Sequence, residues 1–223
     1  ESKTFDILKP KNFYYMKASG EEKNLEVFKK EIIKSNRAKI LKEEIKLPQT
    51  TSDLKIVYKY YPDFGVHLWK NSYMFISIRS IQKINPIIKS HFHDDQLSIT
   101  FKLKDKSILK DFGSYIYTPY PKLRNLYRSR KIHFPSSYEP NTVSKLFENL
   151  EISPVICSYS GVDGFSGIYK SKFSLDKIVM YFRNNKVYII RSSEPISNIE
   201  KLFFRDENYN KFYYSPSYGS LEN

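Results

Sequence analysis

Residues 97–104, Leu-Ser-Ile-Thr-Phe-Lys-Leu-Lys, decide the fold class of this chain. Apolar and polar side chains alternate through the whole stretch, and in a β-strand a period of two places one kind of side chain on each face. The stretch therefore predicts a strand with one buried and one solvent-facing side. Asp105 and Lys106 are expected to form a turn, after which Ser107 to Phe112 can return as the second strand of a hairpin.

The same period of two recurs elsewhere in the chain. A second hairpin is predicted over residues 177–191, because Asn184 and Asn185 at its centre tolerate the positive φ angles of a tight turn. Many short strands without helices between them favour an antiparallel β-sandwich over a parallel α/β sheet, so we expect an all-β fold. Further strands are expected at residues 54–60, 73–79, 154–160 and 168–173, and His67 falls in another strand pattern.

The first part of the chain has a different pattern. A capping-box sequence that begins at Ser19, followed by apolar residues at roughly helical spacing, predicts a helix from Glu21 to Leu47. Pro48 is expected to end this helix. We therefore divide the chain into a helical lead-in and linker at 1–53 and a β-sandwich domain at 54–223.

Composition limits the possible partners. The 223 residues carry 37 Lys and Arg against 24 Asp and Glu, a formal net charge of +13, which favours a polyanion such as acidic polysaccharide, nucleic acid or anionic lipid. The lone Cys157 excludes an internal disulfide. No apolar run approaches the roughly 20 residues that cross a bilayer, so we expect no membrane span. The lack of a basic helix or RNA-binding motif disfavours nucleic acid as the partner.

The histidines are few and clustered. His91 and His93 precede the strand at 97–104 and, together with Asp95, share the parity of its buried face if no bulge intervenes. Ionisable groups on a buried face are costly unless they are paired or bound to a metal ion. Imidazoles at positions i and i+2 of a strand point the same way, as two zinc ligands can. The alternative is that both histidines are ordinary polar residues at a strand edge.

Three motifs follow one another between positions 91 and 133. They are residues 91–98 (HFHDDQLS), residues 111–117 (DFGSYIY), and residues 124–129 (RNLYRS) leading to His133. In this order they resemble the motif series of the heparinase II/III-like polysaccharide lyases. The resemblance covers roughly residues 54–191.

The resemblance implies a β-sandwich that carries half of an active site. The other half would come from an N-terminal α-helical toroid domain of the same protein, so the isolated chain is expected to be inactive. Members of the family cleave anionic, uronate-containing polysaccharides by β-elimination, and the resemblance favours a secreted or periplasmic location. It further implies a structural zinc ion held by His93, Asp111 and His133, and an active-site role for His91.

Elimination chemistry suggests roles for the remaining candidates. The reaction removes a weakly acidic proton beside the uronate carboxylate, so the carboxylate must be neutralised with a base and an acid nearby. His91 can act in this way at neutral pH. Arg124 and Arg128 can bind carboxylate or sulfate groups of the substrate, and Asp95 is expected to orient a ligand or a loop.

Aromatic residues complete the candidate site. Tyr115, Tyr117, Tyr120 and Tyr127 are candidates for a sugar platform or a proton shuttle; we assign Tyr117 to catalysis and Tyr127 to substrate binding. Two alternatives stay open at this point. The arginines can be surface residues of a basic loop, and the sandwich can be a non-catalytic module that binds acidic glycans.

Overall fold

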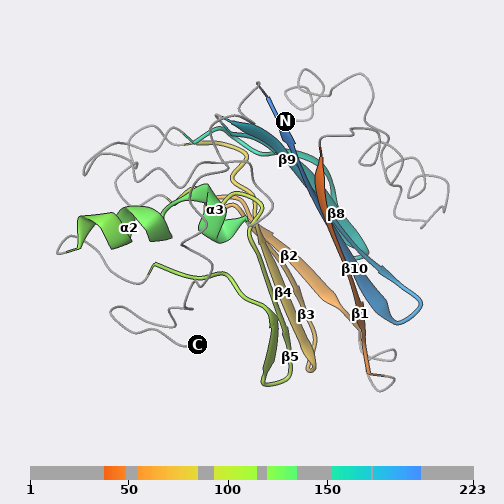
Figure 1. The fold of residues 1–223 in the computed structure, drawn as a ribbon. Helices are drawn as coiled ribbons and strands as arrows, with labels where there is room; N and C mark the ends of the chain where they lie inside the picture. Colours follow the sequence, from red (N-terminus) through yellow and green to blue (C-terminus); the bar gives the residue numbers. More distant parts are fainter. Residues whose placement is uncertain are drawn as a thin grey trace.

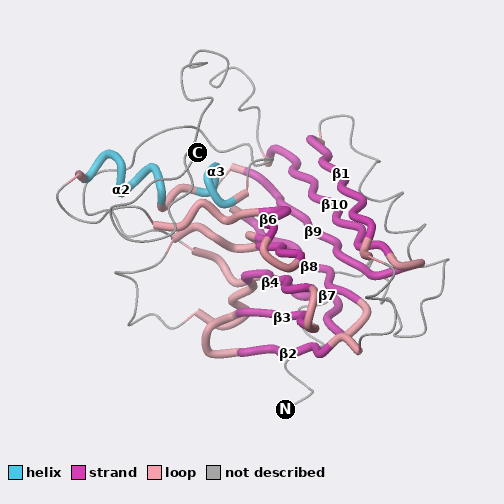
Figure 2. Tube along the Cα trace, turned by 90° about the horizontal axis from the view of Figure 1, so that it is seen from below, coloured by secondary structure: helices cyan, strands magenta, loops and turns pink. Residues whose placement is uncertain are grey.

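The computed structural model describes residues 38–48, 55–84, 93–114, 120–134, 152–171 and 173–196. These residues form two antiparallel sheets of five strands each, which pack against one another (Figure 1, Figure 2). The all-β sandwich expected from the sequence is confirmed. The part of the expected helix that falls at 21–37 lies outside the described residues.

The first sheet has the strand order β1-β10-β9-β8-β7. Its longest strands form the hairpin expected at 177–191, with Asn184 and Asn185 as the two-residue turn at φ angles of 48° and 58°. Two successive positive φ angles give a turn whose twist matches that of the flanking strands. The strands are β1 (Lys39–Lys46), β7 (Ile156–Gly161), β8 (Gly164–Lys170), β9 (Ser174–Arg183) and β10 (Lys186–Pro195).

The second sheet is a meander in which the strands follow chain order, β2-β3-β4-β5-β6. The hairpin expected from residues 97–104 is present, with its turn at Lys104 and Asp105, one position earlier than predicted. The strands are β2 (Val57–Tyr61), β3 (Val66–Lys70), β4 (Met74–Arg79), β5 (Ile99–Leu103) and β6 (Lys106–Leu109).

Strand β1 corrects the prediction that helix extends to Leu47. All eight residues of β1 pair with β10, and Ile45 packs against the main core. The error has a physical reason, since Leu41 and Ile45 are four positions apart and a spacing of four fits a strand as well as a helix. Pairing along the full length of β10 outweighs a weak local propensity. The sheet therefore includes residues before position 54, where we had placed the start of the sandwich.

The main core lies between the two sheets. Trp69, Ile78 and Phe101 of the second sheet and Ile178 and Met180 of the first are fully buried in it. Each such side chain contributes about 1.5–3 kcal/mol by leaving water, so this layer is the principal source of stability.

Two short helices, α2 (Pro121–Tyr127) and α3 (Arg130–His133), lie beside one end of the second sheet, away from the β5–β6 turn (Figure 1). Pro121 occupies the first turn of α2, where its missing N–H costs no hydrogen bond. These are the helices of the described ranges. Neither is long and apolar enough to cross a membrane.

Candidate functional site

The segment before β5 is a turn and does not extend the strand. Leu97 has a φ of 63°, and its N–H donates to the Arg79 carbonyl at 2.7 Å. Asp94 and Gln96 are buried as a result, whereas His93 and Asp95 are partly exposed. The expectation that His93 and Asp95 continue the buried parity of β5 is therefore wrong, because the turn at Leu97 breaks the alternation.

A backbone hydrogen bond ties this segment to the helices. The Asp94 N–H donates to the Arg128 carbonyl at 2.9 Å. The link between α2 and α3 is closed by Ser129, whose hydroxyl donates to the Leu126 carbonyl at 2.6 Å. These contacts bring the 93–98 segment and α3 together, so that His93 and His133 face one another although 40 positions separate them.

Three of the side chains singled out from the sequence converge here. His93 Nδ1 lies 3.2 Å from His133 Nε2, and the two ring centroids are 5.3 Å apart. On the other side of the same ring, His133 Nδ1 lies 2.8 Å from Asp111 Oδ2. The Gly113 N–H donates to the second oxygen of Asp111 at 2.9 Å and fixes the carboxylate. We call His93, His133 and Asp111 the imidazole–carboxylate cluster.

Hydrogen-bond chemistry determines which atoms of the cluster carry protons. His133 Nε2 also lies 2.8 Å from the carbonyl oxygen of Tyr127, which can only accept, while Asp111 accepts from Nδ1. Both nitrogens of His133 therefore donate, and the ring is an imidazolium. His93 Nδ1, close to the same Nε2–H, must be unprotonated.

The local electrostatics agree with this assignment. Burial alone would lower the pKa of His133, but the Asp111 carboxylate, its hydrogen bond and the charge of Asp95 raise that pKa. Burial, with the positive charges of His133 and Arg128, lowers the pKa of His93 to about 3. Although burial opposes it, His133 keeps the pKa of Asp111 below its usual value. The cluster is thus a neutral imidazole beside an ion pair.

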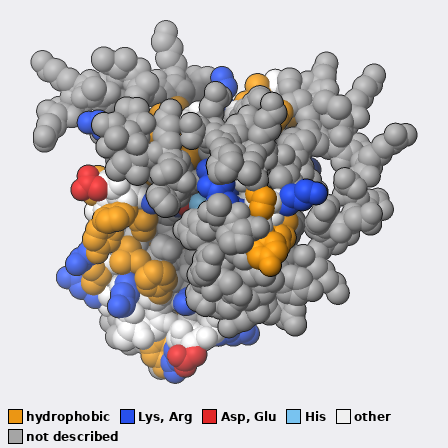
Figure 3. All heavy atoms as spheres, turned by 90° about the vertical axis from the view of Figure 1, so that its left-hand side faces the viewer, with side chains coloured by type: hydrophobic (Ala, Val, Ile, Leu, Met, Phe, Trp, Pro, Cys, Tyr) orange, Lys and Arg blue, Asp and Glu red, His pale blue; other side chains and the backbone are white. Residues whose placement is uncertain are grey.

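Two arginines add positive charge beside His93. The charges of Arg128 and Arg124 both help to lower the pKa of His93, so both guanidinium groups act on the cluster. Arg128 is buried and Arg124 is half-buried, with Nη1 3.2 Å from the Asn125 side-chain oxygen. Figure 3 shows histidine atoms beside Lys or Arg atoms near the middle of the face on the α2 side of the molecule.

The other sequence-derived candidates have different positions. The Tyr127 ring is buried, and the Tyr127 atom that contacts the cluster is its carbonyl oxygen. Asp95 lies 3.4 Å from Arg79 Nε and acts on His133 through its charge. His91 and Tyr117 lie outside the described residues.

A zinc ion fits part of this arrangement. Two ligands of a tetrahedral zinc ion, each about 2.0–2.1 Å from the metal, are roughly 3.3 Å apart, close to the 3.2 Å between His93 Nδ1 and His133 Nε2. Asp111, however, contacts the opposite nitrogen of His133, the position of a group that orients a ligand. Within the described ranges no three His, Cys, Asp or Glu side chains are grouped to hold a metal ion.

A buried polar network behind the cluster was not anticipated from the sequence. Arg130 is completely buried, and its Nε donates to Asp176 Oδ2 of β9 at 2.7 Å. Its Nη1 donates to the Gln96 carbonyl, and Asp94 lies 3.9 Å away. Ser193 donates to the second oxygen of Asp176 at 2.5 Å. Arg130 thereby connects the 93–98 segment and α3 to the first sheet.

Comparison with known proteins adds no relative. A scan of family models finds no match to this chain, and searches of curated proteins and of solved structures find none either. The three motifs and the geometry of the cluster are therefore the features of this chain that bear on its function.

Proposed function

We propose that this chain is the β-sandwich part of a polysaccharide lyase that cleaves an anionic, uronate-containing polysaccharide by β-elimination. Its site would be completed by a helical domain of the same protein. The observation that carries this proposal is the meeting of the motif residues, since His93 and Asp111, which come from separate stretches of the chain, each lie within hydrogen-bond distance of His133.

The charges around the cluster suit this chemistry. In the elimination a base takes the proton from the carbon beside the uronate carboxylate, a carbon–carbon double bond forms, and the glycosidic oxygen leaves and is protonated. Negative charge grows on the carboxylate, so fixed positive charge nearby lowers the barrier. Arg124 and Arg128 are proposed to supply such charge, whereas the charge of His133 is balanced by Asp111. His91 is proposed to act directly on the substrate, with Tyr117 as a partner in proton transfer.

Zinc is a secondary part of the proposal. When bound, a zinc ion would supply a fixed positive centre that holds the 93–98 segment against α3. His93 and His133 have the separation that two ligands need, and zinc binding would displace the Nε2 proton of His133, while Asp111 would bind the ion or orient His133. We derive no catalytic step through the metal, because the third donor does not lie beside the other two.

The test is an activity assay on the full-length parent protein. Unsaturated uronate, detected by its ultraviolet absorbance, should form from at least one uronate polymer. His93→Ala should lower kcat/KM by about 10²-fold or more, the usual size of a lost preorganised group. His67→Gln, a change at a fully buried histidine in a separate aromatic cluster, is the matched control.

The results separate an enzyme from a binding module. A parent that binds acidic polysaccharide and forms no unsaturated product from uronate polymers would contradict the lyase proposal and favour the non-catalytic module. Turnover by the isolated chain would contradict the idea that a helical domain completes the site.

A further inference from the structure

The two sheets differ in how their charged side chains are paired. The strands of the second sheet carry Lys59, Lys70, Arg79, Lys102 and Lys106 and no Asp or Glu. In the first sheet, carboxylates pair with cations across neighbouring strands, with nitrogen–oxygen distances of 2.5–3.2 Å for Glu44–Lys186, Glu43–Arg191 and Glu194–Lys177. Within the described residues, Arg79 is the one strand cation of the second sheet that pairs with a carboxylate, that of Asp95.

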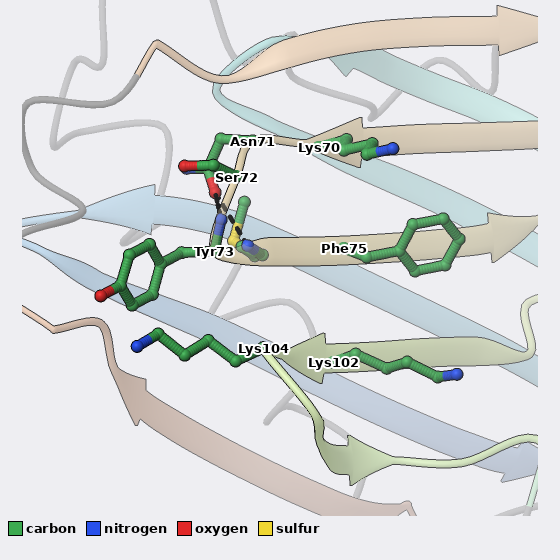
Figure 4. Close-up of a pocket in the computed structure, with 8 residues that line it drawn as sticks. Lys70, Asn71, Ser72, Tyr73, Phe75, Lys102 and Lys104 are labelled. Atoms are coloured by element: carbon green, nitrogen blue, oxygen red, sulfur yellow. Dashed lines mark hydrogen bonds between the residues drawn. The ribbon is translucent and has the colours of Figure 1, made fainter.

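Three lysines of the second sheet, Lys59, Lys70 and Lys102, pair with no carboxylate of the described residues and lie on one face. The register places Lys70 opposite Phe75 and Phe75 opposite Lys102, so the three side chains form one row across β3, β4 and β5. Figure 4 shows the Phe75 ring between the two lysine side chains. Both lysines are exposed, and strand spacing puts their backbones roughly 10 Å apart. Lys59 lies on the same face of β2, opposite Leu68.

The row borders a shallow recess. Its volume is about 320 Å³, and its lining includes Lys70, Tyr73, Phe75, Lys102 and Lys104 (Figure 4). The Asn71 side chain accepts the N–H groups of Tyr73 and Met74 at 2.9 and 2.8 Å, which fixes the β3–β4 turn that forms one wall. The recess is therefore built on rigid sheet and turn backbone.

The same face leads to the imidazole–carboxylate cluster. Phe75, Ser77 and Arg79 alternate along the outer side of β4, and two strand steps of two residues span about 14 Å. At the far end Arg79 contacts Asp95, whose charge acts on His133. Arg79 and Asp95 thus link the face that carries the lysine row to the cluster.

We propose that this surface, the outer face of β2–β5 around Lys59, Lys70, Phe75 and Lys102, is a binding strip for an anionic polysaccharide chain. An extended chain that carries a carboxylate or sulfate on successive sugars matches cations separated along an open face, whereas a compact phosphate would contact one of them at a time. The Phe75 ring offers an apolar surface for the C–H face of a sugar between the charges. The choice of a polysaccharide as ligand rests on the proposed function. The strip itself is inferred from the lysine charges and the strand register.

The test compares two triple variants of the full chain that remove equal charge. K59Q/K70Q/K102Q alters the strip, and K42Q/K46Q/K170Q alters exposed lysines of the first sheet. Binding of an oligogalacturonate, of dextran sulfate and of single-stranded RNA is measured by calorimetry at low salt. Neutral dextran is the uncharged probe. The strip variant should bind one or both acidic glycans roughly 5- to 20-fold more weakly, and the control variant less than about twofold.

Three outcomes would contradict the proposed binding strip. Equal losses in the two triple variants would mean that binding follows net charge alone. Retained affinity in the strip variant would mean that the glycan binds elsewhere. A larger loss for single-stranded RNA than for either glycan would identify a different polyanion.

Failure of the strip and failure of the lyase proposal are distinguishable. The strip is tested by the glycan affinity of the two triple variants, and the lyase site by the activity of the parent and its His93→Ala variant, so either measurement can fail without the other. A parent whose activity does not depend on His93 would contradict the lyase site and leave the strip standing.

Discussion

Arg130 and Asp176 form an ion pair that is completely buried, with Nε and Oδ2 2.7 Å apart, and this pair joins the segment beside the candidate site to strand β9. Burying two charges is costly, and the pair persists because Asp176 also accepts from Ser193 and Arg130 also lies over the rings of Phe134 and Tyr169. Removing one partner therefore leaves an uncompensated charge in the core.

Asp176→Ala should lower the free energy of unfolding by about 3–5 kcal/mol, since Arg130 loses its buried partner. Chemical denaturation of the two proteins measures the difference. Lys177→Ala is the matched control, because the Lys177–Glu194 pair is partly exposed and should contribute no more than about 1 kcal/mol. A loss below that level in Asp176→Ala would contradict the structural importance of the pair.

His67 should make stability depend on pH. Burial lowers its pKa from 6.5 to about 4, and Nε2 has no hydrogen-bond partner among the described residues. The unfolded chain then binds more protons than the folded chain between these two values, so the free energy of unfolding falls as the pH drops from 6.5 towards 4. The full effect is about 3 kcal/mol.

Denaturation curves over this pH range test the role of His67. His67→Phe should reduce the fall by up to about 3 kcal/mol and leave the part that comes from His93, whereas Tyr58→Phe, which deletes the hydroxyl 2.9 Å from His67 Nδ1, should retain the whole fall. If His67→Phe and the unmodified chain lose stability in parallel, other groups are responsible.

The β9–β10 turn should tolerate glycine and reject branched residues. Asn184 has a φ of 48°, so Asn184→Val should cost about 1–2 kcal/mol of folding free energy, while Asn184→Gly should be close to neutral. Thermal unfolding of the two variants measures the contrast. Similar melting temperatures would mean that the turn adopts another conformation in solution.

Zinc binding should depend on two histidines more than on Asp111. Elemental analysis of the chain prepared with zinc and without chelator should give about one equivalent, and less than about 0.2 would contradict the site. His93→Ala and His133→Ala should abolish binding. Asp111→Asn should weaken it by about 10- to 100-fold if the carboxylate orients His133, and abolish it if Asp111 is a direct ligand.

Local signals explain what could be predicted about the fold. The two hairpins follow from alternation and from turn residues a few positions apart, and both are present. The helix predicted up to Leu47 failed at β1, because the pairing of β1 with β10 depends on residues far along the chain. A spacing of four between Leu41 and Ile45 cannot distinguish the two structures.

In the candidate site, too, nearby residues in the sequence predicted some features, whereas contacts with distant residues could not be predicted. The resemblance implied that His93, Asp111 and His133 share a metal ion; in the structure His93 and Asp111 contact opposite ring nitrogens of His133. The positive φ of Leu97 turns Asp94 and Gln96 inward, and an alternation pattern contains no sign of such a turn. The partner of Arg130 lies 46 positions away, so nothing near Arg130 in the sequence identifies it.

The pairing of β1 with β10 also determines when this protein can finish folding. Glu43 and Arg191 are 148 positions apart, so β1 is synthesised long before the strand with which it pairs. Until β10 is made, β1 has no partner strand, and the backbone of an unpaired strand can pair with other chains. Such long-range strand pairing slows folding, because the entropy of closing the intervening chain is lost before the contacts form.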